Sequence, residues 1–205
     1  MPPRGLEPAV RFLAACGVLL ALAHFFGRDL LESILPLYRW ELGVLDDRYR
    51  ILQLGLATQG ADAVIRLDVA LQRPLVVGGH LVLPDPRGHA SVTTLTGNAL
   101  QPVIVFLALL VAWPARGLVR GAARAAGGLC LLPVLLMLDI PFVLAGELWA
   151  LFVDRYAPAN FSPLLAWKDF LQGGGRLAMA FAAGALVIGL AGRLPAPAAA
   201  ELRRA

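Results

Sequence analysis

Long apolar runs and short alternating runs divide this chain into two kinds of segment. The apolar runs lie at about residues 10–26, 100–114, 125–153 and 177–191, and the second is short unless Ala99 and its neighbours extend it. A helix that crosses a bilayer needs about 20 mainly apolar residues. The pattern therefore predicts four membrane-spanning helices.

The first apolar run has a second interpretation, as a secretory signal peptide. A short basic start precedes it, and "ALA" at residues 21–23 has the small-x-small form of a cleavage site. The following "HFFG" keeps the run apolar. We therefore favour a retained anchor over cleavage.

Helical spacing continues beyond this run and then changes. The apolar positions after residue 28 are Leu30, Leu31, Ile34, Leu35, Tyr38 and Leu42. This spacing predicts a helix that lies on the membrane surface or extends the first span. Proline removes a helical hydrogen bond, so the helix should break or bend near Pro36.

From about residue 48 the apolar period becomes two, which indicates strands. The stretches are "YRILQLGLATQ", "ADAVIRLDVALQR", "PLVVGGHLVLP" and "ASVTTLTG", with "PDPRGH" as the turn before the last. We predict three or four antiparallel strands between about residues 48 and 96. About 50 residues form too small a core for independent stability. This unit should lean on the membrane, on its own helices or on a partner.

Composition supports a membrane protein. Of the 205 residues 59% are hydrophobic and only 16% are charged, whereas soluble domains are nearer half apolar and a quarter charged. The net charge of +4 does not indicate nucleic-acid binding, because the basic residues are scattered and form no stripe with interleaved aromatics.

The arginines instead predict an orientation, since short cytoplasmic loops are rich in Lys and Arg. With both termini inside, the cytoplasmic pieces carry Arg4, Arg11, Arg116, Arg120, Arg124, Arg193, Arg203 and Arg204 against only Glu7 and Glu201. Residues 28–98, on the other side, hold seven basic and eight acidic residues. Trp113 would then mark the inner interface, and Trp40, Trp149 and Trp167 the outer one.

Two acids, Asp139 and Glu147, lie in the third apolar run. A mid-bilayer acid costs about 3 kcal/mol on insertion scales, and the apolar residues of this run return roughly 5 kcal/mol. The run can therefore insert despite Asp139. On a helix the two acids are about 12 Å apart along the axis, which is too far for a shared-proton dyad.

Each acid has several interpretations. Glu147 should lie near the outer interface, where the first span offers His24 and the fourth begins with Arg176. We predict a Glu147–Arg176 pair, with solvation by headgroups as the alternative. Asp139 lies deeper, so it should pair with a helix or a partner protein, unless it is protonated and silent. Catalysis or a proton relay is the least favoured role for either acid.

The sequence predicts no catalytic, cofactor-binding or metal-binding residues. It contains no CxxC, HExxH, GxGxxG or Walker-type motif. Cys16 and His24 are eight positions apart in one helix, about 12 Å, which is beyond hydrogen-bond reach. His80 and His89 could bind a metal only if the fold joined them to a carboxylate such as Asp85. We interpret them as solvated turn residues.

Small residues recur along the fourth apolar run at helical spacing, at Ala178, Ala182, Ala185, Gly189 and Gly192. Such a stripe lets another helix approach closely, within this chain or in a partner. The alternative is a simple composition bias towards Ala and Gly. Before the run, "WKDFLQGGGR" contains three glycines, which predict an external turn or a re-entrant bend. A phosphate cradle there is not favoured.

The stretch "TGNALQPVIVFLALLVAWPARG", residues 96–117, joins a strand through an Asn-containing turn to an apolar span that ends in proline and arginines. Together with "FLQGGGR" and the order of spans, it resembles the exosortase-associated accessory proteins of bacterial inner membranes. The resemblance implies a companion of a sorting enzyme. It carries over no catalytic residue, because the Cys, Arg and His spacing of the exosortases is missing here.

We therefore expect a mainly α membrane protein of about four transmembrane helices, with a small external β subdomain between helices 1 and 2. Its parts are an anchor (1–27), an external unit (28–98), a three-helix membrane region (99–193) and a cytoplasmic tail (194–205). The expected role is a non-enzymatic accessory or assembly subunit for envelope protein sorting or export, with a membrane-protein partner and no cofactor. The partner contacts would use the two acids, Arg176, His24 and the small-residue stripe. The alternatives are a small proton-coupled transporter or channel subunit using Asp139 and Glu147, and an intramembrane hydrolase using Cys16 or Cys130.

Overall fold

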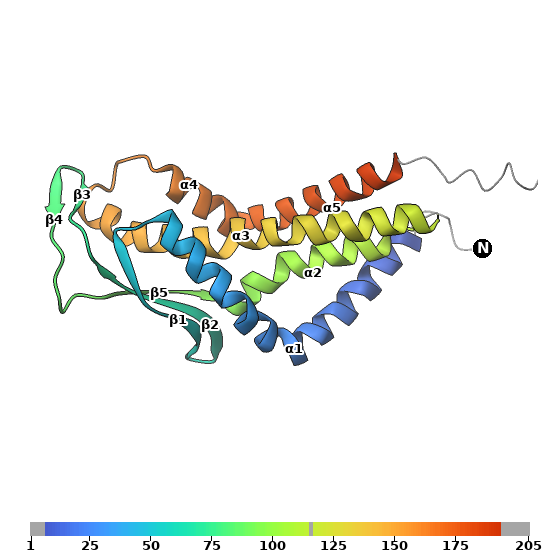
Figure 1. The fold of residues 1–205 in the computed structure, drawn as a ribbon, viewed down its shortest axis with the longest axis horizontal. Coiled ribbons are helices and arrows are strands. Elements are labelled where there is room, and N and C mark those ends of the chain that lie inside the picture. Colours follow the sequence, from blue (N-terminus) through green and yellow to red (C-terminus); the bar gives the residue numbers. More distant parts are fainter. Residues whose placement is uncertain (1–6, 115–116, 194–205) are drawn as a thin grey trace, which may run out of the picture.

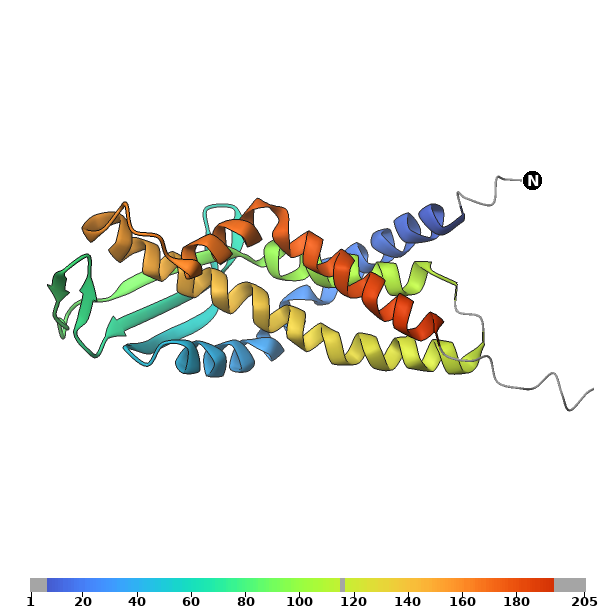
Figure 2. The same cartoon turned by 90° about the horizontal axis from the view of Figure 1, so that it is seen from above.

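The computed structural model describes residues 7–114 and 117–193 as an elongated, mainly α structure with a small β-sheet at one end (Figure 1). The elements are α1 (Glu7–Leu45), β1 (Tyr49–Gln59), β2 (Asp62–Leu71), β3 (Leu75–Val77), β4 (His80–Val82), β5 (Ala90–Leu95), α2 (Thr96–Ala112), α3 (Leu118–Tyr156), α4 (Pro163–Phe170), the π-helical segment η1 (Leu171–Gly175) and α5 (Arg176–Gly192). The start of α1, the end of α2, the start of α3 and the end of α5 all lie at the end away from the sheet (Figures 1 and 2).

Three helical stretches are long and apolar enough to cross a membrane: Glu7–Leu45, Leu118–Tyr156 and Pro163–Gly192. α2 is also apolar but has only 17 residues, at the lower limit for a spanning helix. The expectation of a mainly α chain with long apolar helices and a small sheet between helices 1 and 2 is confirmed. The finer expectation that α2 makes a fourth span stays a prediction.

The first helix is longer than one span. α1 has 39 residues and continues through Pro36. Of the expected break or bend at this proline, the break is wrong and the bend stays a prediction. Figure 1 shows α1 as two arms that meet at an angle near α2, with the second arm running beside the sheet. The second arm keeps its helical form because its apolar side is packed, with Leu31, Tyr38 and Leu42 buried. That packing outweighs the one backbone hydrogen bond that proline removes.

The main sheet is antiparallel, with strand order β1-β2-β5. The β1–β2 register shifts between Ile51 and Gln53, so Leu52 is the extra residue of a β-bulge, and it is exposed. In the central strand Ile65, Leu67 and Val69 are buried while Arg66 is exposed. This is the alternation expected of a sheet with one packed face.

The stretch expected as a single third strand is instead a hairpin. β3 and β4 pair with each other, and Gly78 (φ 57°) and Gly79 (φ 81°) make the turn between them. Two successive residues with positive φ match the tight turns that join short antiparallel strands. The external unit thus holds five strands in the described part of the chain, where three or four were expected.

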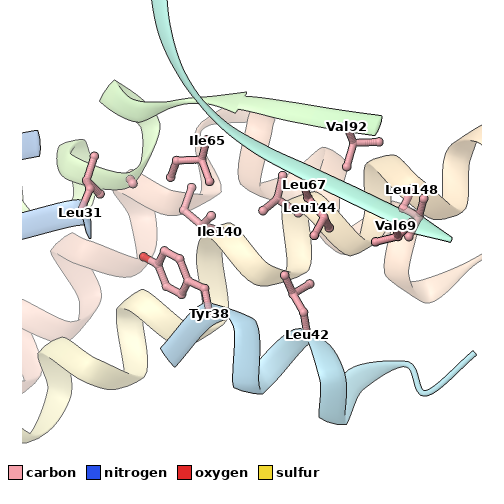
Figure 3. Packing of buried hydrophobic residues seen from close by; sticks show 11 residues of the cluster. Leu31, Tyr38, Leu42, Ile65, Leu67, Val69, Val92, Ile140, Leu144 and Leu148 are labelled. Atoms are coloured by element: carbon pink, nitrogen blue, oxygen red, sulfur yellow. The ribbon is translucent and has the colours of Figure 1, made fainter. Parts of the chain in front are cut away.

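The main core lies between the second arm of α1, the sheet and α3. Figure 3 shows Tyr38 and Leu42 of α1 on one side of Ile140 and Leu144 of α3, with Leu67 of β2 beyond them. All of these side chains are at most 7% exposed. The sheet therefore leans on the chain's own helices, one of the three supports that its small size predicts.

Glycines bring the remaining helices together. A Cβ atom at Gly27 of α1 would lie 2.9 Å from Leu100 of α2, and one at Gly184 of α5 would lie 2.9 Å from Leu109 of α2. A Cβ at Gly128 of α3 would lie 2.7 Å from Leu110. Close approach at small residues is the usual packing mode of helices in membranes.

Candidate functional site: two ion pairs between α3 and the last helical segment

A buried ion pair joins α3 to α5. Asp139 Oδ1 lies 3.4 Å from Arg176 Nη2, and the two side chains are 2% and 5% exposed. Among the described residues neither carboxylate oxygen of Asp139 has a hydrogen-bond partner, so the contact is mainly one of charge. An unpaired charge at this depth would be costly, and each residue supplies the opposite charge for the other.

The glycine triplet is part of the structure that positions Arg176. The glycines of residues 167–176 were expected to form an external turn or a re-entrant bend, but α4 and η1 carry a helical course through them, with a kink. Gly174 has φ 104° and kinks the chain there, a conformation that a glycine adopts without steric cost. A Cβ at Gly175 would lie 2.5 Å from the ring of Phe170. The kink and this close packing start α5 with Arg176 on its buried side.

Glu147 also contacts the last helical segment, which comprises α4, η1 and α5 (Pro163–Gly192). This contact lies nearer the sheet than that of Asp139. Its Oε1 accepts a hydrogen bond of 2.7 Å from Gln172 Nε2 and lies 3.6 Å from Lys168 Nζ. The neighbouring Gly146 allows this approach, because a Cβ there would lie 2.8 Å from the Cβ of Lys168. The side chain of Glu147 is 32% exposed, so its pair contributes little compared with a buried one.

The predicted Glu147–Arg176 pair is therefore wrong in its partner. The two ion pairs follow one antiparallel register: Asp139 and Glu147 are eight positions apart on α3, and their partners Arg176 and Lys168 are eight apart on the facing segment. Treating the glycine triplet as an external turn put Arg176 at the outer surface. Because α4 and η1 are helical, Arg176 lies farther along α3 from the sheet, beside Asp139, and Lys168 takes the place beside Glu147.

Tryptophans add two more polar links around these pairs. Trp167 of α4 donates from Nε1 to the carbonyl of Leu138 at 3.2 Å, next to Asp139 and one turn before Pro141. Trp149 donates from Nε1 to Ser162 Oγ at 3.1 Å. Both indoles, expected to mark the outer interface, thus also tie α4 and its preceding loop to α3.

The small-residue stripe of α5 does not pack inside this chain. Its five members, Ala178, Ala182, Ala185, Gly189 and Gly192, are all exposed. A Cβ at Gly189 or Gly192 would meet no atom within 4 Å in the described structure. The opposite side of α5, with Ala180, Gly184 and Val187, is buried. Of the two packing roles that the sequence allowed, the one within this chain is wrong.

Arg124 has a structural role, although the sequence predicts it only as a marker of the cytoplasmic side. It is 9% exposed and donates to the carbonyls of Leu110 (3.0 Å), Trp113 and Pro114 (3.3 Å). These carbonyls lie at or just beyond the end of α2, where helical acceptors lack partners in their own helix. Arginine spacing alone gives no signal for this capping role, because it depends on how the start of α3 packs against the end of α2.

The remaining candidates stay apart from the ion pairs. His24 is exposed on α1, where its ring packs edge-on against Phe25 at 5.3 Å. Cys16 and Cys130 are free thiols. Within residues 7–114 and 117–193 there is no group of three or more His, Cys, Asp or Glu side chains that could hold a metal ion. The arrangement can pin helices together, and it presents no nucleophile–base pair among its contacts.

No known protein family, curated protein or solved structure matches this chain.

Proposed function

We propose that this protein is a non-enzymatic accessory subunit of a bacterial envelope sorting or export system, embedded in the inner membrane by α1, α2, α3 and α5. Both termini would be cytoplasmic, and the sheet would lie outside. The resemblance of residues 96–117 to exosortase-associated proteins supports this role. The partner would be a membrane protein that supplies the catalytic chemistry.

The observation that carries the proposal is the exposed stripe of small residues on α5. One side of α5 is buried against this chain, while Ala178, Ala182, Ala185, Gly189 and Gly192 form a separate exposed row. Small residues at this spacing favour close packing with a second helix in a membrane. Asp139 and Arg176 are buried against each other, which supports a role for this pair inside the chain. Partner binding is therefore assigned to the stripe, and the ion pairs hold α5 in place behind it.

The test is co-purification of the tagged full-length chain from native membranes in mild detergent, with mass spectrometry. We expect one membrane protein in stoichiometric amount with the wild type. The double variant Ala182→Leu/Ala185→Leu should lose it at an unchanged level of the chain, because leucines keep the stripe apolar but prevent close approach. The matched control is Gly17→Leu on α1, where a Cβ meets no atom within 4 Å. A homomer alone, or equal recovery with both variants, would refute the accessory role.

The alternatives give different results. A proton-coupled transporter that uses Asp139 should lose its function in Asp139→Asn without a change in protein level. A structural acid should instead lower the level or the thermal stability of the chain. An intramembrane hydrolase should lose its activity when Cys16 and Cys130 are both replaced by serine. Full function in that double variant would remove the hydrolase from consideration.

A further inference from the structure

Two cavities lie end to end along α1 and α2, and their linings differ in character. The first, of about 430 Å³, lies beside the β1–β2 hairpin, and its polar lining includes His24, Arg28 and Thr58. The second, of about 620 Å³, runs between α1 and α2 and is lined mainly by apolar residues such as Leu20, Ile104 and Val105. Both linings contain Ala23, His24 and Leu100, so the two cavities adjoin, and together they are called the groove below.

The groove is polar where α1 leaves the proposed membrane span and apolar at membrane depth. The residues that line its polar end include one arginine and one histidine, and no carboxylate among the described residues. Arg28 forms a 3.0 Å pair with Glu32, four residues along the helix, and the side chains are 79% and 51% exposed. Exposed pairs of this kind are weak. Arg28 can therefore leave Glu32 and bind another anion with little loss of free energy.

We propose that this groove binds one anionic phospholipid from the leaflet on the sheet side of the membrane. The phosphate would lie against Arg28 and His24, and an acyl chain would lie between α1 and α2. An amphiphile fits because a free anion would leave the apolar part of the groove unfilled, and an apolar chain alone would leave Arg28 unused. Basic pockets between membrane helices are suited to anionic headgroups. The inference uses the proposed membrane placement but not the accessory role, so the co-purification result does not decide it.

The first test is lipid binding by the delipidated full-length chain in detergent, measured by native mass spectrometry with phosphatidylglycerol and phosphatidylcholine. We expect one phosphatidylglycerol to bind preferentially. Arg28→Gln should reduce this preference about fivefold. This factor corresponds to the binding free energy of about 1 kcal/mol that one arginine contributes near an anionic surface. Arg50→Gln, an equal charge change at an exposed residue outside the groove, should keep it. Equal preference in both variants, or loss in both, would overturn the headgroup site.

The apolar part is tested by filling it. Gly97 lines the groove, and a Cβ there meets no atom within 4 Å, so Gly97→Leu adds bulk to the groove from a Cβ that has free space. It should reduce binding of both lipids. Gly17→Leu, with the same free space but outside the lining, should leave binding unchanged. Equal binding by the two variants would overturn the chain-binding part.

A second measurement needs no substitution, so it does not depend on whether a variant folds. Cys16 lines the apolar groove, whereas Cys130 is exposed on α3. Phosphatidylglycerol should slow alkylation of Cys16 by a small maleimide and leave Cys130 unaffected. Glycerol phosphate, which has no chains, should protect neither thiol. Protection of Cys16 by glycerol phosphate, or no protection by phosphatidylglycerol, would overturn the proposal.

Discussion

At the scale of single residues, the two ion pairs between α3 and the last helical segment differ mainly in burial. The Asp139–Arg176 side chains are 2% and 5% exposed, whereas Glu147 is 32% exposed. Removing one partner from a buried pair leaves an uncompensated buried charge. In a more exposed pair, water solvates the charge that remains. The Asp139–Arg176 pair should therefore contribute more than the Glu147–Lys168 pair to the stability of the packing between α3 and α5.

We predict that Asp139→Ala and Arg176→Ala each lower the free energy of unfolding by about 3–5 kcal/mol. The double variant Asp139→Leu/Arg176→Met should recover most of this loss, because an apolar pair leaves no buried charge. Glu147→Gln, the control, should change it by less than about 1 kcal/mol. Unfolding in mixed micelles by titration with denaturing detergent measures these differences. A double variant less stable than either alanine variant would contradict the pairing.

Asp68 of β2 gives a pH-dependent prediction in the sheet. Burial acts to raise the pKa of this carboxyl, but hydrogen bonds from Ser91 and Arg66 and the nearby charges of Arg66 and His89 outweigh it and hold the pKa below its usual range. The Arg66 Nε–Oδ1 distance is 3.0 Å, and Ser91 is the cross-strand partner of Asp68. Because the folded pKa is depressed, this stabilisation is present above the unfolded value of about 3.9 and is lost as pH falls through the folded pKa.

Hydrogen exchange of the β2 and β5 amides between pH 5 and pH 2 tests this, after correction for the intrinsic pH dependence of exchange. Protection in the wild type should decrease towards the acid end, and Asp68→Asn should show less of this decrease. Asp62→Asn, at an exposed acid of the same strand, should follow the wild type. A decrease of equal size in both variants would show that other groups control the acid response.

At the scale of elements, the β3–β4 hairpin is attached to the end of α3 through its turn. A Cβ at Gly78 would lie 2.6 Å from the carbonyl oxygen of Tyr156 and 2.7 Å from the Cβ of Ala157. At Gly79 the φ angle is also positive, but a Cβ would meet no atom within 4 Å. The two glycines thus separate the cost of backbone conformation from the cost of close contact.

We predict that Gly79→Ala destabilises the hairpin by about 1 kcal/mol, the usual cost of positive φ for alanine. Gly78→Ala should cost at least 1 kcal/mol more, because a backbone carbonyl must move as well. Hydrogen exchange of the hairpin amides and of the last turn of α3 measures both effects. If the two variants expose these amides equally, the hairpin is not docked through Gly78.

The positions of most helices and strands could be predicted from the sequence. The segments that could not be predicted contain glycines. Apolar runs located the long helices, and the period of two located the sheet. The "VVGGH" stretch predicts one strand, whereas in the structure its two glycines form the turn of a hairpin. The glycines at residues 173–175 predict an external turn or a re-entrant bend, whereas in the structure they continue a helix through a kink. Glycine permits both outcomes, and packing against Tyr156 or Phe170 selects between them.

Helix packing also explains why the contacts of the candidate site could be predicted only in part from the sequence. The sequence identified Asp139, Glu147 and Arg176 as polar residues that need partners, because charges in apolar helices must be compensated. It could not assign the partners, since the depth of Arg176 depends on whether the preceding residues are helical. The exposed stripe of α5 and the capping role of Arg124 likewise depend on how the helices pack, which spacing alone does not determine.

At the scale of the whole molecule, the length of α1 bears on how the protein lies in a membrane. A helix of 39 residues is about 58 Å long, and the apolar core of a bilayer is about 30 Å thick. The second arm packs on the sheet through Tyr38 and Leu42, so this arm and the sheet must lie on the same side. The end of α2 and the start of α3 lie at the opposite end of the molecule (Figures 1 and 2).

We therefore predict opposite accessibility for two single cysteines placed in a chain with Cys16→Ala and Cys130→Ala. Asp85→Cys, at an exposed residue between β4 and β5, should react with a membrane-impermeant maleimide in intact spheroplasts. Leu118→Cys, 93% exposed at the start of α3, should react only after permeabilisation. The reverse result would invert the orientation that the arginines predict. Reaction of both sites in intact spheroplasts would mean that α2 does not cross the membrane, because a spanning α2 must separate the two labels.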